Sequence, residues 1–178
     1  MEKKFELTAE CKVVCGIKLF RIKALRAIAR FGVRVGDLGG WVEKEENVDH
    51  DGSAWVYGDA MVYGSARVCG SAWVCGSAWV CDDARVYGSA MVCGSAEVYG
   101  DARVYGSADC LWFKNMWSSG RWFTYTRSNK KWKVGCFYGT GEELIAKAYK
   151  DSELSGKCYE ATVRYVEAIE KAKEGGAK

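Results

Sequence analysis

The sequence contains no proline and only one histidine, and each of these shortages narrows what the chain can be. With His50 alone, a zinc site would have to consist almost wholly of thiolates, and no two of the nine cysteines form a Cys-x-x-Cys pair. We therefore expect no metal. Without proline, the turns depend on the 21 glycines, which is typical of a fold that turns often at fixed positions.

Long apolar segments are also missing. No run approaches the ~20 residues that a membrane span needs, and residues 1–11 lack the apolar core of a signal peptide. We expect a cytosolic protein without a membrane partner, in which the cysteines are reduced and act as small hydrophobic side chains. The net charge of +3 is too mild to indicate nucleic acid by itself. At 178 residues and 49% hydrophobic, the chain can bury one core.

What the sequence does have is a six-residue repeat, Ala-x-Val-x-Gly-[Ser/Asp], in which aspartate replaces glycine only at Asp82. Alanine and valine lie two residues apart, so they share one face of an extended strand. The glycine and the serine or aspartate after it supply a turn. One unit cannot bury this face alone, so successive coils must stack. Alanine recurs at positions 54, 60, 66, 72, 78, 84, 90, 96, 102 and 108. Valine lies two positions after each of the first nine alanines.

Two or three units could form one coil, and the outward side chains favour three. A 12-residue coil would mix their chemistry, whereas an 18-residue coil sorts it and stacks Cys75 on Cys93. The sequence thus predicts a mainly β fold, a short left-handed parallel β-helix of about three 18-residue coils over residues 52–110. Its left-handed coiling is an exception to the rule that connections between parallel strands are right-handed. The predicted columns are Arg67, Arg85 and Arg103; Trp55, Trp73 and Met91; and Met61, Trp79 and Glu97.

Different segments flank the repeat. Residues 1–51 are expected to form an N-terminal cap and an irregular first coil, with Val42 and Val48 in the alanine phase. Residues 111–178 are expected to form a small α+β unit that covers the open end of the solenoid, which would otherwise be an exposed sheet edge. The expected elements are a strand and a short helix within 18–32, strands at 111–117, 121–126 and 131–137, a helix at 140–149 opened by a Thr140–Glu143 capping box, and a helix at 157–173.

Three stretches carry a family resemblance: RIKALR (21–26), GDLGGWVEKEENV (36–48) and the GSAWVYGDA repeats that follow. They resemble hexapeptide-repeat proteins of phages, prophages and enterobacteria, which are often labelled transferases or polymer-forming proteins. The segment VGCFYGTGEELI (134–145) is similar to the C-terminal unit of many phage members. The resemblance implies the β-helix fold and a phage or prophage source. It implies no function, because the transferase label rests on fold analogy.

His50 lies in the valine phase and is the candidate residue for catalysis. In a hexapeptide acyltransferase using acetyl-CoA, it would be the general base that takes a proton from the attacking hydroxyl or amine. The structural alternative is a polar residue at the junction of the cap and the first coil, which we favour because no flanking segment resembles a CoA-binding loop. The γ-type carbonic anhydrases share this fold but need several histidine ligands, so they are excluded.

Three groups of outward side chains are candidates for ligand binding. The arginine column could grip an anion, but we favour a solvated face in which Asp83 and Asp101 neutralise the arginines. The tryptophans of the repeat could form an apolar surface for self-association or for a ligand. The C-terminal unit mixes aromatic and basic residues that could stack bases and hold phosphates, or could be its core and solvated face. The candidates are Arg67, Arg85 and Arg103; Trp55, Trp73 and Trp79; and Arg121, Trp122, Tyr125 and Lys131.

These observations favour a non-enzymatic phage or prophage binding protein. We expect a homo-oligomer, a trimer or a multiple of one, that sequesters a nucleotide-like anionic ligand or blocks a host defence protein without a cofactor. Direct nucleic-acid binding has weaker support. An acyltransferase with His50 as base and a structural, self-assembling protein stay open as alternatives.

Overall fold

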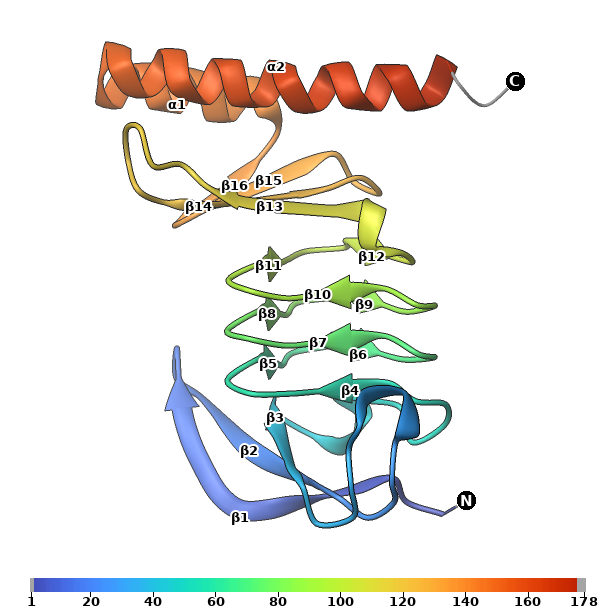
Figure 1. Ribbon diagram of the computed structural model, residues 1–178. Helices are drawn as coiled ribbons and strands as arrows, with labels where there is room; N and C mark the ends of the chain where they lie inside the picture. The colour runs from blue at the N-terminus through green and yellow to red at the C-terminus, as the bar shows by residue number, and fades with distance from the viewer. Residues whose placement is uncertain (1, 176–178) are drawn as a thin grey trace.

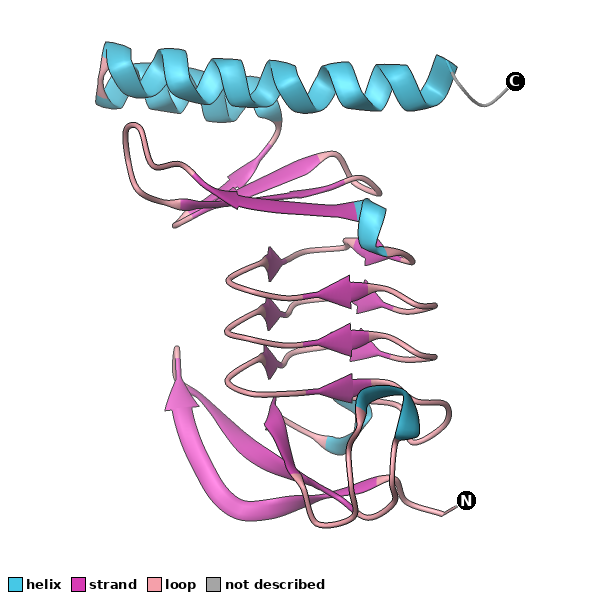
Figure 2. Cartoon of the chain, in the orientation of Figure 1, coloured by secondary structure: helices cyan, strands magenta, loops and turns pink. Residues whose placement is uncertain are grey.

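Each six-residue unit of the repeat forms one two-residue strand in the computed structural model, which describes residues 2–175. Parallel pairing joins these strands into three ladders, β4–β7–β10, β5–β8–β11 and β6–β9–β12 (Figure 2). Partners such as Trp55 and Trp73 are 18 residues apart, so three units complete one coil and the predicted period is confirmed. The strands are β4 (Trp55–Val56), β5 (Met61–Val62), β6 (Arg67–Val68), β7 (Trp73–Val74), β8 (Trp79–Val80), β9 (Arg85–Val86), β10 (Met91–Val92), β11 (Glu97–Val98) and β12 (Arg103–Val104).

The alanines and valines of the repeat fill the interior of the solenoid. From Ala54 to Val104 none of them is more than 1% exposed. Turn glycines such as Gly76 have φ near +68°, a region that L side chains rarely adopt. Asp82 replaces glycine at φ 59°, which aspartate tolerates better than most residues, and its carboxylate accepts a hydrogen bond from the Gly100 N–H at 3.1 Å. The exception in the repeat is therefore compatible with the same turn.

The irregular first coil expected within residues 1–51 is present, and with the regular coils after it the solenoid has about four turns. Strand β3 (Leu38–Val42) pairs with β5, joining Val42 to Val62, and a bridge joins Val48 to Val68. These partners are 20 residues apart, so the first coil has two residues more than the others, within the corner after Val48. Val42 and Val48 therefore occupy valine positions, and the predicted alanine phase is wrong.

An antiparallel hairpin, β1 (Phe5–Val14) and β2 (Ile17–Ala24), closes the N-terminal end (Figure 1). Strand β2 pairs with β3, so the hairpin extends one face of the solenoid into a sheet of order β1-β2-β3-β5-β8-β11. The strand expected within 18–32 is β2, but the expected helix is only a 3₁₀ turn, η1 (Ala29–Phe31). Strand β1 was not predicted. A second 3₁₀ turn, η2 (Glu45–Asn47), lies in the first coil.

The C-terminal unit begins with the 3₁₀ turn η3 (Ser107–Asp109) and contains a four-stranded antiparallel sheet and two helices. Three strands were expected; Gly135, at φ 56°, divides the third into two. The Thr140–Glu143 capping box is confirmed, since Thr140 Oγ1 accepts from the Glu143 N–H at 3.3 Å. The elements are β13 (Cys110–Lys114), β14 (Trp122–Thr126), β15 (Lys131–Val134), β16 (Phe137–Gly139), α1 (Gly141–Asp151) and α2 (Glu153–Gly175).

This sheet lies between the last coil and the helices (Figure 1). Backbone N–H groups of each coil donate to carbonyls of the next, so those of the last coil need other acceptors. Thr124 Oγ1 accepts from the Glu97 N–H at 2.9 Å, and Ser128 Oγ accepts from the Arg103 N–H at 2.7 Å. The other face of the sheet packs against α2, where Phe123 lies 4.7 Å from the Tyr159 ring. No helix within residues 2–175 has the length and apolar character needed to cross a membrane.

Candidate functional site

The predicted arginine column exists on the outer surface of one solenoid face. Arg67, Arg85 and Arg103 open β6, β9 and β12, and their strands pair residue for residue. Adjacent strands lie ~4.8 Å apart, so the three guanidinium groups can reach one narrow strip of surface. All three side chains are exposed. We call these three residues the arginine strip.

The expected neutralisation of this strip by Asp83 and Asp101 is wrong. Within residues 2–175, neither Arg85 nor Arg103 forms an ion pair. Asp101 instead accepts a hydrogen bond from the Asn129 amide at 3.0 Å, because the C-terminal unit reaches down to this corner. Only Arg67 is paired, with Asp49 at 2.6 Å. Two aligned cations are therefore left available to an anionic partner.

Tyrosines flank the same strip. Tyr87 and Tyr105 follow Arg85 and Arg103 by two residues, their ring centroids are 3.5 Å apart, and Tyr105 is 58% exposed. Desolvation, with the Tyr105 hydroxyl as the next contribution, raises the pKa of Tyr87 to about 12. The phenol is therefore neutral at physiological pH and does not repel an anion held by the arginines.

A hollow of about 320 Å³ lies where the strip meets the C-terminal unit. Arg127 crosses it in an ion pair with Glu170 at 2.8 Å, and this hydrogen bond raises the pKa of Arg127. Lys130 also borders the hollow and has no ion-pair partner in the described part of the chain. The hollow thus brings together Arg103 and Lys130, which form no ion pair in the described structure, and the exposed ring of Tyr105. Its lining residues are Arg103, Tyr105, Asp109, Arg127, Ser128, Lys130 and Glu170.

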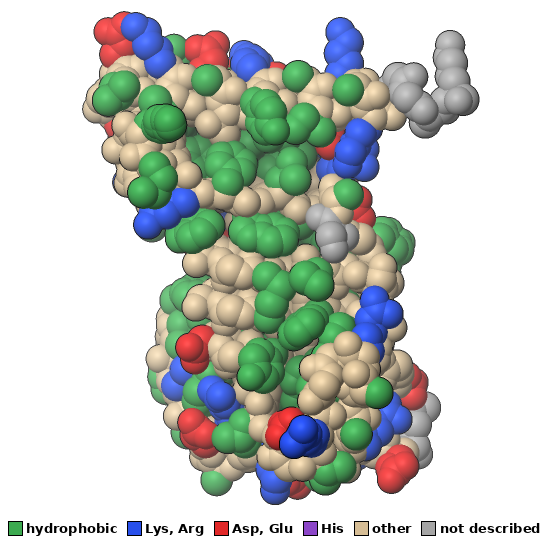
Figure 3. Space-filling model, in the orientation of Figure 1, with side chains coloured by type: hydrophobic (Ala, Val, Ile, Leu, Met, Phe, Trp, Pro, Cys, Tyr) green, Lys and Arg blue, Asp and Glu red, His purple; other side chains and the backbone are tan. Residues whose placement is uncertain are grey.

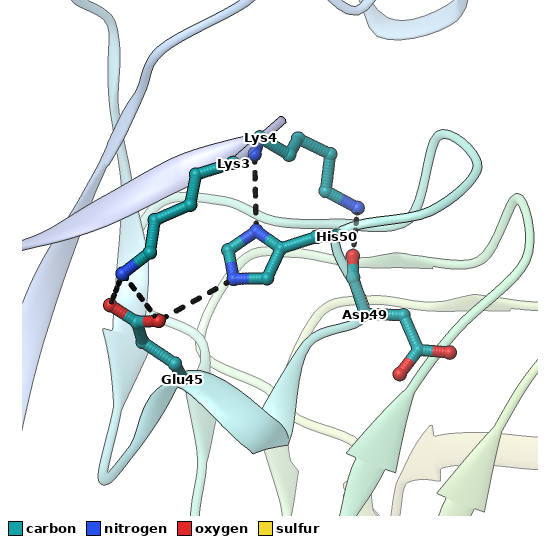
Figure 4. Close-up of polar contacts among 5 residues, drawn as sticks. All are labelled: Lys3, Lys4, Glu45, Asp49 and His50. Atoms are coloured by element: carbon teal, nitrogen blue, oxygen red, sulfur yellow. Dashed lines mark hydrogen bonds and ion pairs between the residues drawn. The ribbon is translucent and has the colours of Figure 1, made fainter. Parts of the chain in front are cut away.

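His50 joins the N-terminal hairpin to the first coil (Figure 4). Its ring stacks on Phe5 with centroids 4.5 Å apart, and Nδ1 accepts a hydrogen bond from the Lys4 N–H at 3.1 Å. Nε2 is buried and faces Glu45 Oε2 at 3.6 Å, and Glu45 is also bound by Lys3 at 2.8 Å. Hydrogen bonding to Lys3 is the main cause that lowers the pKa of Glu45. Nδ1 is thus hydrogen-bonded to the cap and Nε2 is buried beside Glu45, which fits the structural role considered for His50 from the sequence.

Lys4 is a buried charged group that sequence reasoning missed. It is 0% exposed, and its ammonium donates to the Asp49 carbonyl (Figure 4). Burial, followed by the charge of Arg26, lowers the pKa of Lys4 to about 8. No local signal in the sequence separates Lys4 from the exposed Lys3 beside it, because the burial comes from residues 45 positions away.

The tryptophans of the repeat do not form one open surface. Trp55 is 0% exposed, since the cap covers it and Phe5 lies 6.3 Å away, so its expected place on the outer surface is wrong. Trp73 packs on Phe31 at 4.5 Å, and Trp79 lies 6.4 Å from the ring of Tyr63. Both are half-buried. Figure 3 shows hydrophobic side chains gathered along the visible face of the solenoid and beneath the helices.

The aromatic and basic candidates of the C-terminal unit are divided among different faces. Tyr125 is 5% exposed and packs 5.0 Å from Trp132 on the helix side of the sheet. Trp122 and Lys131 belong to the opposite, solenoid-facing set of strand positions, and Trp122 is 38% exposed. Arg121 borders a separate hollow of about 250 Å³ beside Lys147. Of the two interpretations considered from the sequence, one combined surface does not form, because strand alternation separates these residues.

Comparison with known proteins supports the repeat fold of the solenoid. Residues 54–70 and 78–94 match the family model of the YdcK β-solenoid repeat. The chain is a β-solenoid repeat protein. Among curated proteins, none shows significant similarity to it. The match supports the coils of this β-solenoid repeat protein and leaves the arginine strip and both caps to be interpreted from their own geometry.

Cysteines of this β-solenoid repeat protein stack as the 18-residue period predicts, but they are not all reduced. Cys75 and Cys93 form a disulfide between successive coils, with Cα atoms 4.6 Å apart. The expectation that every cysteine is a free thiol is therefore wrong for this pair. Burial raises the pKa of Cys81 to about 11, so this thiol is protonated at neutral pH. Across residues 2–175, no group of His, Cys, Asp or Glu is arranged to hold a metal ion.

Proposed function

We propose that this β-solenoid repeat protein is a non-enzymatic binding protein that holds a nucleotide-like anionic ligand on its arginine strip. The observation that carries the proposal is the alignment of Arg85 and Arg103 in register, with no ion pair to either in the described structure. A guanidinium group offers a planar fork of donors that matches two oxygens of a phosphate. Two such forks in one column suit a ligand with more than one anionic group.

The residues beside the strip favour a ligand that also carries a ring. Tyr105 exposes its ring next to Arg103 and borders the same hollow as Lys130. Stacking of a base on an aromatic side chain contributes ~1–3 kcal/mol, whichever base it is. Phosphates on the arginines with a base against Tyr105 would use both features, which a plain inorganic anion would not.

The resemblance to hexapeptide-repeat proteins of phages and prophages supports a biological setting for this binding. A phage protein in the cytosol of its host that sequesters a signalling nucleotide would counter a defence that depends on that nucleotide. Blocking a host defence protein through the same exposed strip is the other form of this role. Both use the solenoid as a rigid frame for side chains rather than as a catalyst.

Two alternatives have less support from the geometry. An acyltransferase needs His50 as a reachable base, yet its Nε2 is buried against Glu45 and its Nδ1 accepts from Lys4. A self-assembling fibre would need open solenoid ends, yet the hairpin covers one end and the four-stranded sheet covers the other (Figure 1). Both arrangements agree better with a discrete binding protein.

Calorimetric titration with ATP, and with uncharged adenosine as the control ligand, tests the proposal. We expect ATP to bind the wild type and adenosine to bind far more weakly. The double variant Arg85→Gln/Arg103→Gln should lose at least tenfold in ATP affinity, because hydrogen bonds to charged groups contribute ~1.5–3 kcal/mol each. Arg34→Gln is the matched control, since Arg34 is an exposed arginine of the N-terminal segment.

Three results would contradict the proposal. Equal ATP binding by the wild type and the double variant would place the ligand elsewhere. Absence of binding by ATP and by the other common nucleotides would remove the nucleotide-like class. Turnover of acetyl-CoA by the wild type would favour the acyltransferase instead.

A further inference from the structure

The turn between β14 and β15 carries a lysine to the end of the arginine strip. Ser128 of this turn accepts a hydrogen bond from the Arg103 N–H at 2.7 Å (Figure 1). Within the coils the corresponding acceptor is a carbonyl of the next coil, as where the Arg85 N–H donates to the Ala102 carbonyl at 2.8 Å. The turn therefore takes the place of a further coil above the strip, and its Lys130 borders the same hollow as Arg103.

The backbone of Lys130 has a conformation that lysine rarely adopts. Its φ is 53°, in the left-handed region that favours glycine. Asp82 lies in the same region, but its carboxylate accepts a compensating hydrogen bond from the Gly100 N–H. Within residues 2–175 the Lys130 side chain forms neither a hydrogen bond nor an ion pair. Its strain is not offset there, and strained residues of this kind are concentrated at sites that hold ligands.

Hydrogen bonds from the neighbouring Asn129 hold this turn in place. The Asn129 amide group donates to Asp101 at 3.0 Å and to the Tyr138 hydroxyl at 3.1 Å. Its oxygen accepts a hydrogen bond from the Lys131 N–H at 3.2 Å. The turn is thus tied both to the last coil and to β16. A turn fixed in this way keeps Lys130 beside the hollow, so less entropy is lost when a ligand binds.

The two carboxylates that line the hollow have other partners. Glu170 pairs with Arg127 at 2.8 Å, and Asp109 accepts two hydrogen bonds of 3.0 Å from backbone N–H groups. They leave the Lys130 ammonium without an ion pair in the described structure. The strip therefore ends in three unpaired cations rather than two.

Three cations in succession suit a ligand with more than one phosphate. The single phosphate of a nucleoside monophosphate offers three free oxygens, which the guanidinium forks of Arg85 and Arg103 can already engage. Such a ligand leaves no oxygen for Lys130. A second or third phosphate gives the ammonium an oxygen of its own, while the base stays against Tyr105.

We propose that Lys130 is a phosphate-binding residue and that it makes the site select nucleoside di- and triphosphates over monophosphates. This inference rests on the proposed function, because it requires a nucleotide on the arginine strip. The left-handed turn lowers stability in order to place the ammonium at the hollow, a trade-off typical of residues retained for binding.

Calorimetric titration with ATP, ADP and AMP in magnesium-free buffer tests the selectivity. We expect Lys130→Gln to bind ATP and ADP about tenfold more weakly than the wild type, with much less change for AMP. Lys130→Arg keeps the charge and should retain the preference for ATP over AMP. Lys150→Gln is the matched control, because Lys150 is an exposed lysine of α1 that forms no ion pair in the described part of the chain. It removes the same charge and should leave all three affinities unchanged.

Thermal unfolding provides a second measurement, which also confirms that the variants are folded. Lys130→Gly should lose the same ATP affinity as Lys130→Gln yet unfold at a higher temperature, because glycine adopts a positive φ without strain. A Lys130→Gly variant that is no more stable than Lys130→Gln would contradict the strained placement of the lysine.

The failure of this inference can be told apart from the failure of the proposed function. If Arg85→Gln/Arg103→Gln weakens ATP binding but Lys130→Gln leaves the ratio of ATP to AMP affinity unchanged, the selectivity by Lys130 is overturned and the strip stands. If the wild type binds none of the three nucleotides, both are overturned.

Discussion

Lys4 is buried where the hairpin meets the first coil, and its charge is costly there. Its ammonium group donates to the Asp49 carbonyl, but no carboxylate forms an ion pair with it within residues 2–175. Removal from water disfavours the charged form, which is why the pKa of Lys4 is lowered to about 8. In the unfolded chain the same group keeps its ordinary pKa of 10.5. Folding therefore depends on pH at this residue.

We predict that the wild type gains stability relative to Lys4→Met as the pH is raised from 8 to 10. In this range the folded state has released the proton while the unfolded state still binds it, so the free energy of unfolding rises with pH, by up to ~3 kcal/mol. Below pH 8 both states are charged and the cost of burial is present in full. Urea denaturation of both proteins at several pH values gives the difference, in which the titration of tyrosines and cysteines cancels. Parallel curves would show that Lys4 does not titrate in this range.

Gly76 shows how closely the coils approach one another at their corners. Its φ is +68°, and an added Cβ would lie 2.9 Å from the backbone N and O of Gly94. Gly76→Ala should therefore lower the free energy of unfolding by ~2 kcal/mol or more, from left-handed backbone strain and from the contact. Asp82→Gly is the control, because it puts glycine into the equivalent corner, and it should change stability much less. Equal losses in the two variants would contradict this account.

At the scale of the single coil, each turn of the solenoid contacts only the turns above and below it. Stability is then a sum of coil and interface contributions rather than a property of one central core. The disulfide between Cys75 and Cys93 acts at this level, since it closes a segment of one coil length with a sequence separation of 18. In a reducing cytosol the bond would be open, so the stability of these coils depends on the compartment.

Reduction of this disulfide should lower the free energy of unfolding by ~3 kcal/mol, the value expected for a loop of this length. The comparison is urea denaturation with and without a phosphine reductant. The double variant Cys75→Ser/Cys93→Ser is the control, because it has no bond to reduce and should not respond. A wild type that is equally stable in both conditions would mean that the coils gain nothing from the link.

For the whole molecule, the repeat was predictable and the contacts between distant segments were not. The period followed from outward residues such as Arg67 and Arg85, which sort only at 18 positions, and the pairing of their strands agrees. The three-residue spacing of Thr140 and Glu143 also predicted the capping box at the start of α1. By contrast, the burial of Trp55 depends on a hairpin about 50 residues earlier, and Asp101 is diverted from Arg103 by Asn129 of the C-terminal unit. Neither contact leaves a pattern in the local sequence.

Three units per coil also mean that the repeat number sets the rotation between the two ends. The hairpin continues the β5–β8–β11 face through β3, while Thr124 and Ser128 bind the last strands of two particular faces. Insertion of one six-residue unit between Arg85 and Arg103 would turn the C-terminal unit, together with Arg103 and the hollow, by one third of a revolution away from Arg85. Insertion of 18 residues would lengthen the prism by ~4.8 Å and leave the alignment intact. Duplication of repeat units during evolution can therefore preserve the arginine strip and its adjoining hollow only in whole coils.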